Sequence, residues 1–451
     1  MIKANLYNSK VATVIDGDKK ITILSLAFPL LIQIILSNLI NTAGITVLSS
    51  YSEIYVTATS VADQIIAIPR LVLESLVSGT VILSSISFGK NDRKTAASIC
   101  GCGVITVFVL SIIVGIAMAA FAEPLTDIMN LKGETAKLCH DYLFLAALTV
   151  MPGQLMFGAF QKLLICNGHS EIIPISSISA GALNVLLSYV VLNVIDLPIG
   201  DMYALAIKTA FAWLIGVVIV VAAFVIVKCP LKLSFDLGTA CRIAKIGIPA
   251  GMSLISFSFS GTVTTGFLAD MGDSIVNTKV YINNIVTYVS IIFYSISLAN
   301  AVIMGRHRGA GRFEDMKILF KQNLILALAI NGTLSVICYL LREPLLRIFT
   351  SDSQVLSLAG IIMLIDIPIE LARGINHLAE NSLNPNGDVK TTLAVSVAAA
   401  WVFSVLLGYL LCVTAGLGLV GLWIGFLCNE AFKATVYLLR WRSGKWTKTA
   451  V

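Results

Sequence analysis

Five ionisable residues share one face of an otherwise apolar segment, DIPIELARGINHLAE at residues 366–380. They are Asp366, Glu370, Arg373, His377 and Glu380. Steps of three and four residues place them along one side of a helix. A charged side chain near the centre of a bilayer costs about 2.5–3.5 kcal/mol, so we expect this side to face other helices or water. An acid that keeps no cationic partner there is a candidate carrier of a proton.

This charged stripe holds three acids and one arginine, so ion pairing leaves acids over. We predict that Glu370 is the leading cation-coupling acid, because it lies in the middle of the segment, and that Asp366 is second. Arg373 is the predicted partner of these acids, and His377 is a candidate proton relay. Glu380 lies close to the end of the segment, where a solvated acid is the simpler interpretation. The alternative is a static ion pair of Asp366 or Glu370 with Arg373 that only fixes helix packing.

A second charged stripe, Asp63, Arg70 and Glu74, lies at i, i+7 and i+11 of another apolar segment. These positions also share one helical face, so we predict that their side chains line a substrate cavity. The same role is predicted for four amides in apolar segments: Gln33, Asn38, Asn41 and Asn283. The alternatives stay open, since the charges could form static pairs and amides also hold membrane helices together.

The elements that position these residues are predicted membrane helices. Of the 451 residues, 57% are hydrophobic and 12% are charged, and the mean hydropathy is +0.91. A membrane-spanning helix needs about 20 mostly apolar residues. Twelve segments meet this criterion: 22–48, 54–86, 96–121, 139–163, 171–194, 203–227, 243–268, 276–303, 318–341, 356–380, 391–413 and 417–439. The predicted fold class is an all-α polytopic membrane protein with twelve transmembrane helices in the lipid bilayer of the plasma membrane.

Basic residues indicate how these helices are oriented. One alternating set of loops and tails carries 22 Lys and Arg residues, and the opposite set carries 6. Because basic loops stay in the cytoplasm, both termini are predicted to be cytoplasmic. The net charge of +6 is spread over loops rather than gathered on one basic face, which argues against a nucleic-acid partner.

The two halves of the chain repeat one another. Five matches share an offset of 219 or 220 residues: AEPLTDIM at 122–129 with REPLLRIF at 342–349, Pro29 with Pro249, Gly89 with Gly309, Tyr189 with Tyr409, and Asn167-Gly168 with Asn386-Gly387. Six helices per half give both halves one orientation, so we predict two parallel six-helix repeats related by a pseudo-twofold axis along the membrane normal. The predicted parts are a cytoplasmic leader (1–21), two lobes (22–227 and 242–440), a cytoplasmic linker (228–241) and a cytoplasmic tail (441–451).

Three prolines inside the predicted spans are candidate hinges, namely Pro29, Pro249 and Pro368. Proline removes one helix hydrogen bond and can kink a membrane helix. Pro29 and Pro249 occupy equivalent positions of the repeat, so we predict that the first helix of each lobe bends.

The chain resembles the multidrug and toxic compound extrusion (MATE) family, within the larger superfamily that includes lipid-oligosaccharide flippases. The resemblance covers nearly the whole chain. It rests on an ordered set of segments: LAFPLLIQIILSNLIN, SFGKNDRKTAA, KIGIPAG, GRHRGAGRFEDMK, REPLLRIFTSDSQV, ARGINHLAENSLNPNGDVKTTL and GLGLVGLWIGFLCNEAFKATVYLLRWRSGKW. It implies two six-helix lobes that face a central cavity. It also implies export of substrates, often organic cations, driven by inward flow of protons or sodium ions.

The sequence departs from the family pattern at the usual coupling acids. A position that is acidic in the first span of many members falls on Gly44, and one in the tenth span falls at or near Arg373. The seventh span, with MSLISFSFSGTVTTGFL, has no acid. The resemblance therefore leaves the coupling ion, H⁺ or Na⁺, open; no other cofactor, no metal site and no catalytic residue is predicted.

Three functions are compared. The first is a secondary antiporter, expected to be a monomer, that exports small amphipathic cations by alternating access, since the two stripes are acidic overall. The second is a flippase for lipid-linked oligosaccharides or other lipids, but a pyrophosphate needs clustered Arg and Lys, and only Arg70 and Arg373 are counted inside the lobes. The third is a receptor or membrane enzyme, which the lack of a P-loop, nucleophile elbow or metal triad in the sequence disfavours. We predict a transporter rather than an enzyme.

Overall fold

The computed structural model describes residues 11–16, 19–129, 131–193, 200–269, 271–350 and 352–448. Within these ranges, twelve helices are long and apolar enough to cross a membrane. This confirms the predicted all-α class and the predicted number of spans. Parts of two predicted segments lie outside the described residues, namely 1–10 and 17–18 of the leader and 449–451 of the tail.

The chain forms two compact units. We call residues 25–251 the first unit, and residues 252–451 together with the segment that ends at Leu24 the second unit. The chain passes from one unit to the other twice, after Leu24 and after Gly251. Both passages lie near a predicted hinge proline, Pro29 or Pro249. The predicted division into lobes at 228–241 stays a prediction; residues 228–236 join two helices within the first unit.

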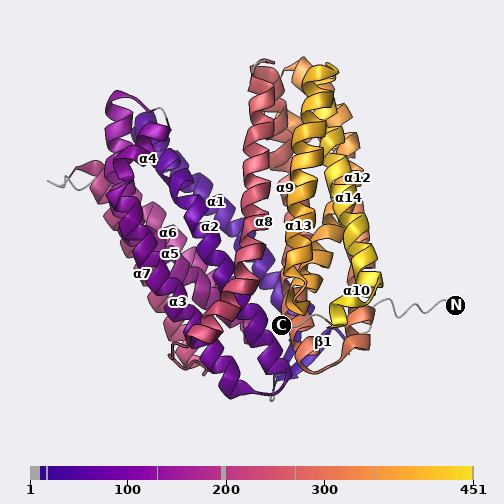
Figure 1. Cartoon of the computed structure of the whole chain (residues 1–451). Coiled ribbons are helices and arrows are strands. Elements are labelled where there is room, and N and C mark those ends of the chain that lie inside the picture. The colour runs from indigo at the N-terminus through magenta and orange to yellow at the C-terminus, as the bar shows by residue number, and fades with distance from the viewer. Residues whose placement is uncertain are drawn as a thin grey trace. The chain divides into compact units, whose positions relative to one another are not determined.

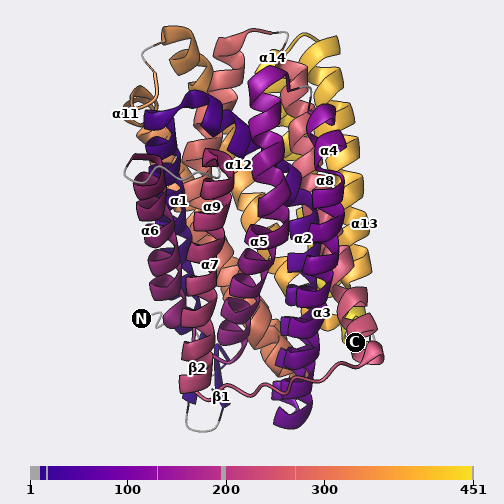
Figure 2. The same cartoon turned by 90° about the vertical axis from the view of Figure 1, so that its left-hand side faces the viewer.

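The first unit is a bundle of long helices. Its elements are α1 (Ile23–Tyr51), α2 (Glu53–Gly89), α3 (Arg93–Ala120), the short α4 (Ala122–Ile128), α5 (Gly133–Cys166), α6 (Ile172–Asn193), α7 (Asp201–Ile226) and the beginning of α8 (Leu237–Ala269). Helix α5 is central, because it packs against α2, α3 and α7 (Figure 2). A Cβ atom on Gly247 of α8 would lie 2.5 Å from the carbonyl oxygen of Ser75 on α2. The glycine therefore lets these two helices approach closely.

The second unit is a similar bundle. Its elements are the rest of α8, α9 (Asp273–Gly309), α10 (Phe313–Leu340), the short α11 (Arg342–Arg347), α12 (Ser353–Leu383), α13 (Val389–Ala399) and α14 (Gly418–Arg442), with a hairpin of β1 (Thr13–Asp16) and β2 (Lys19–Thr22). Helix α12 packs against α9, α10 and α14 (Figure 1). Two π-helical stretches, Ala400–Leu407 and Leu410–Thr414, extend α13 to membrane-spanning length. The leader had not been predicted to contain a hairpin.

Local structure repeats at the offset seen in the sequence. The matching segments AEPLTDI and REPLLR form the short helices α4 and α11. Gly168 and Gly387 both have left-handed backbone angles, with φ of 81° and 79°. Asn91 and Gly311, 220 residues apart, do too, with φ of 61° and 71°. Glycine and asparagine tolerate this conformation, so the duplicated turns explain why these residue types recur. The pseudo-twofold axis itself stays a prediction.

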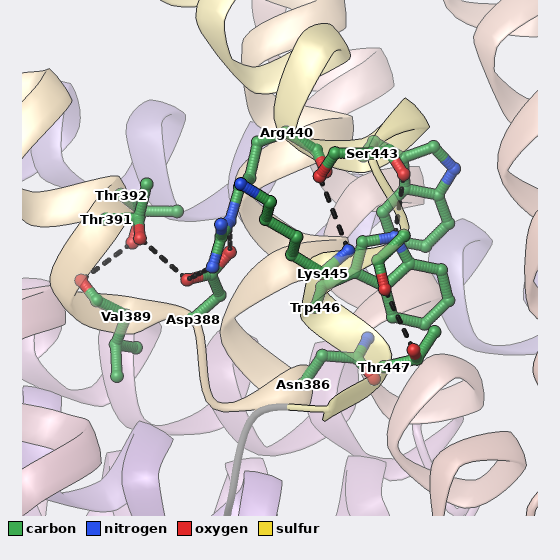
Figure 3. A network of polar contacts seen from close by, with 12 residues as sticks. Asn386, Asp388, Val389, Thr391, Thr392, Arg440, Ser443, Lys445, Trp446 and Thr447 are labelled. Carbon is green, nitrogen blue, oxygen red and sulfur yellow. Dashed lines mark hydrogen bonds and ion pairs between the residues drawn. The ribbon is translucent and has the colours of Figure 1, made fainter.

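One end of the second unit is closed by the C-terminal residues (Figure 3). The Asp388 carboxylate accepts hydrogen bonds from Nε and Nη2 of Arg440 at 2.5 and 3.0 Å. Trp446 is fully buried and stacks on Trp441, with ring centroids 4.2 Å apart. Arg308 donates to the carbonyl oxygen of Trp446 at 3.1 Å. The residues after α14 are therefore packed against the turn between α9 and α10.

Candidate functional site

A polar cavity of about 640 Å³ lies within the first unit. Its walls come from α1, α2, α5, α6 and α7. Of the predicted substrate-cavity residues, five line it: Gln33, Asn41, Asp63, Arg70 and Glu74. Asn38 is not among its lining residues, and Asn283 lies on α9 in the second unit. The charged stripe on α2 therefore faces a cavity, and its role in binding stays a prediction.

The α2 stripe does not form a tight ion pair. Arg70 Nη1 donates to Oε1 of Gln154 at 2.8 Å, whereas Arg70 Nε and Oε1 of Glu74 are 3.8 Å apart. The Asp63 carboxylate is exposed to the cavity, and it makes no hydrogen bond to any residue that the structure describes. The static alternative thus fits Arg70 and Glu74 only loosely, and it does not fit Asp63.

Two lysines of the first unit lie where sequence analysis did not place them. Lys208 had been counted in a loop, but it lies on α7 and lines the cavity. Its Nζ donates to Oδ1 of Asn184 at 2.8 Å and to the hydroxyl of Ser188 at 2.5 Å. Lys162 had been assigned to a turn, but it lies on α5, with Nζ 3.3 Å from the Ser78 hydroxyl. Single lysines near the ends of apolar segments resemble loop residues, so only hydropathy continuing past them could have signalled this.

The α12 stripe of the second unit contains the predicted ion pair at one of its two possible positions. The side chain of Glu370 is fully buried and is ion-paired with Arg373. Glu370 also accepts a hydrogen bond from the hydroxyl of Ser290 on α9 at 2.7 Å. The leading predicted coupling acid is therefore neutralised by a cation one helical turn away.

Asp366 is the acid that this pairing leaves over. It is 6% exposed and accepts a hydrogen bond from the indole Nε1 of Trp423 on α14 at 3.3 Å. Among the described residues, this is its only hydrogen bond, and no cation lies within ion-pair distance of it. The order of the two candidates is thus reversed with respect to their surroundings, because Trp423 and Ser290 come from helices distant in sequence.

The remaining stripe residues lie farther along α12. The ring of His377 packs edge-on against Tyr294 of α9, with centroids 5.2 Å apart. Glu380 is half-buried, although sequence analysis had expected a solvated acid. Next to the stripe, Glu430 of α14 accepts from Lys433 at 2.8 Å and from Asn376 at 2.6 Å. The roles predicted for these groups stay predictions.

The three predicted hinge prolines all lie inside helices, Pro29 in α1, Pro249 in α8 and Pro368 in α12. Each therefore removes a backbone donor from its helix. Their function as hinges stays a prediction.

Apolar helices of spanning length and a buried polar cavity define the class: a polytopic membrane transporter. The chain belongs to the MatE family, because residues 29–190 and 249–410 each match the model of that family. The two matches are offset by 220 residues, which is the offset of the internal repeat.

Relatives align with nearly the whole chain. The chain is 26% identical over 437 residues to the uncharacterized transporter YisQ of Bacillus subtilis, covering 95% of this chain and 96% of that protein. It is 25% identical over 446 residues to the probable multidrug resistance protein NorM of Thermotoga maritima, covering 95% and 93%. The structure of the Vibrio cholerae MATE transporter VcmN in its bent form superposes with a TM-score of 0.84 at 16% identity, covering 94% and 96%. The fold is therefore shared.

Proposed function

We propose that this chain is a secondary antiporter that exports amphipathic organic cations in exchange for protons or sodium ions by alternating access. Membership of the MatE family supports transport. The name of the Thermotoga relative, a probable multidrug resistance protein, supports a drug-like cargo. In this proposal the cargo binds in the first-unit cavity, where Asp63 offers a carboxylate without a hydrogen-bond partner among the described residues.

The observation that carries the coupling part of the proposal is the environment of Asp366. A buried carboxylate with one neutral donor is poorly compensated, so it gains most from a proton or a sodium ion. Binding of either ion removes the uncompensated charge. An ion that binds one arrangement of the lobes more tightly shifts the population toward it. Glu370 and Arg373 are proposed as the neighbouring pair that keeps Asp366 in place.

Export of ethidium from efflux-deficient cells tests this proposal. Wild type, Asp366→Asn and Glu370→Gln are compared at matched membrane expression, with and without a proton-collapsing ionophore. We expect wild-type export to be ionophore-sensitive and Asp366→Asn to lose at least about tenfold of it, a factor worth about 1.4 kcal/mol. Export by Asp366→Asn with unchanged ionophore sensitivity would remove the coupling role. Export that survives the ionophore but requires sodium would change the ion and keep the antiporter.

We also propose that both termini are cytoplasmic. Lys162, Lys208 and Lys279 lie within helices rather than loops. Removing them from the loops leaves 21 basic residues on one side and 4 on the other. The asymmetry therefore supports the same orientation as before.

A flippase for lipid-linked substrates is the second candidate, and one observation favours it. The interior of the first unit holds Arg70, Lys162 and Lys208, so it is more basic than the sequence count implied. Clustered cations suit a pyrophosphate. Failure of well-expressed wild type to export any organic cation, together with movement of a lipid-linked pyrophosphate in vesicles, would select the flippase.

A further inference from the structure

We infer that the first-unit cavity holds an anionic group of its cargo at Lys208, so that the cargo is an amphipathic zwitterion rather than a simple cation. The inference rests on the proposed function, because it takes this cavity as the cargo site. It adds a carboxylate-binding position opposite the cation-binding position at Asp63.

The first observation is that the Lys208 ammonium has only neutral contacts. Its three hydrogen bonds go to the Asn184 side-chain oxygen, the Asn184 carbonyl oxygen and the Ser188 hydroxyl, at 2.8, 3.4 and 2.5 Å. Among the described residues, none places a carboxylate within ion-pair distance of it. A partly buried charge without a counter-charge is costly. Because Lys208 lines the cavity, a ligand can supply that counter-charge.

The second observation is that an unpaired acid lies at a similar depth. The hydroxyls of Tyr51 and Tyr55 both donate to the Asp201 carboxylate, at 3.2 and 2.6 Å, which ties the beginnings of α2 and α7 together. From those beginnings Lys208 is seven residues along α7 and Asp63 ten residues along α2. At 1.5 Å per residue these are about 10 and 15 Å. One small ligand can therefore meet both groups.

The third observation is a contrast with the second unit, where acidic and basic side chains neutralise one another. Contacts join Glu370 to Arg373, Glu430 to Lys433 and Asp388 to Arg440. In the first-unit cavity the nearest approach of opposite charges is 3.8 Å, between Arg70 and Glu74. Paired charges hold helices together, whereas the charges of the first unit remain available to a ligand.

The cavity also suits the apolar part of such a cargo. Its volume of about 640 Å³ lies in the range of drug-sized ligand sites. Phe157 and Trp213 both line it, in an edge-to-face pair with centroids 5.2 Å apart. Aromatic walls bind the ring system of a planar ligand. The predicted cargo is therefore an aromatic molecule that carries both a cationic nitrogen and a carboxylate.

The test compares two dyes that differ only in the carboxylate. Rhodamine B is a zwitterion, and its methyl ester is a cation with the same ring system. Binding of each dye to the purified full-length protein is measured by fluorescence anisotropy for wild type, Lys208→Met and Lys208→Arg. The ratio of the two dissociation constants, taken on one protein sample, does not depend on the fraction of folded protein. Lys279→Met is the matched control, because Lys279 is a buried lysine of the second unit that also contacts threonine hydroxyls.

We expect wild type to bind rhodamine B more tightly than the ester. Lys208→Met should weaken rhodamine B at least tenfold and the ester less than twofold, Lys208→Arg should keep the preference, and Lys279→Met should leave both unchanged. Equal loss of both dyes in Lys208→Met, or wild-type preference for the ester, would overturn the inference. Ion-coupled export of the ester by wild type in cells would then leave the proposed function standing. Absence of coupled export for both dyes would remove that function as well.

Discussion

Asp366 and Glu370 lie one helical turn apart on α12, yet their surroundings differ. Glu370 has the guanidinium of Arg373 and the hydroxyl of Ser290, whereas Asp366 has only the indole donor of Trp423 among the described residues. A buried ion pair that loses one member leaves the other charge uncompensated, which costs about 3–5 kcal/mol. The two acids should therefore respond to neutralisation in different ways.

Glu370→Gln is expected to destabilise the protein by about 3 kcal/mol, because Arg373 then lacks its counter-charge. The double variant Glu370→Gln with Arg373→Gln should recover much of this loss, since no lone charge remains. Thermal unfolding in detergent, followed by tryptophan fluorescence, measures both. A melting temperature of Glu370→Gln equal to that of wild type would show that the pair contributes nothing to stability. Asp366→Asn serves as the control, and its melting temperature should equal or exceed that of wild type.

Sequence periodicity was sufficient to place the two charged stripes on single helical faces. It could not decide which acid pairs, because the deciding groups, Ser290 and Trp423, lie on α9 and α14. It also could not distinguish Lys208 from a loop lysine, since its acceptors lie on the preceding helix, α6. Contacts between residues distant in sequence carry no periodic signal.

At the level of elements, close helix packing depends on glycine where α8 meets α2. A Cβ atom on Gly247 would lie 2.5 Å from the Ser75 carbonyl oxygen, and one on Gly79 would lie 2.5 Å from the Ile243 carbonyl oxygen. Both neighbours are backbone atoms, which cannot rotate away. Small residues of this kind allow membrane helices to approach each other.

Gly247→Ala is therefore expected to lower the melting temperature and the yield of monodisperse protein. Gly261→Ala on the same helix is the matched control, since a Cβ there has no atom within 4 Å. Alanine is favoured over glycine in a helix by about 1 kcal/mol, so the control should be neutral or slightly stabilising. Size-exclusion chromatography and thermal unfolding report both results. Equal behaviour of the two variants would mean that α8 moves aside at no cost.

Predicted helix bounds agreed with the structure to within a few residues, because long apolar runs determine where membrane helices begin and end. The elements that were missed are short. The hairpin β1–β2 and the helices α4 and α11 are too short to show a clear hydrophobic period. The matching segments that form α4 and α11 were recognised as repeats, but their helical conformation was not.

For the whole molecule, the proposed orientation can be measured with the native cysteines. Cys241, near the beginning of α8, is the one exposed cysteine among the described residues. If both termini are cytoplasmic, a membrane-impermeant maleimide should label it in inside-out vesicles and not in right-side-out vesicles. Cys241→Ser should remove most of this labelling. Strong labelling of the wild type in right-side-out vesicles only would reverse the orientation.

The two passages of the chain between the units mean that neither half of the gene encodes a self-contained fold. The first half contributes the hairpin β1–β2 to the second unit, and the second half contributes the beginning of α8 to the first unit. These exchanged pieces are equivalent parts of the repeat, each leading into the first membrane helix of its half. An ancestor with one repeat would then have been a domain-swapped homodimer, whose subunits lent each other their leading segments. Gene fusion made that exchange permanent within one polypeptide.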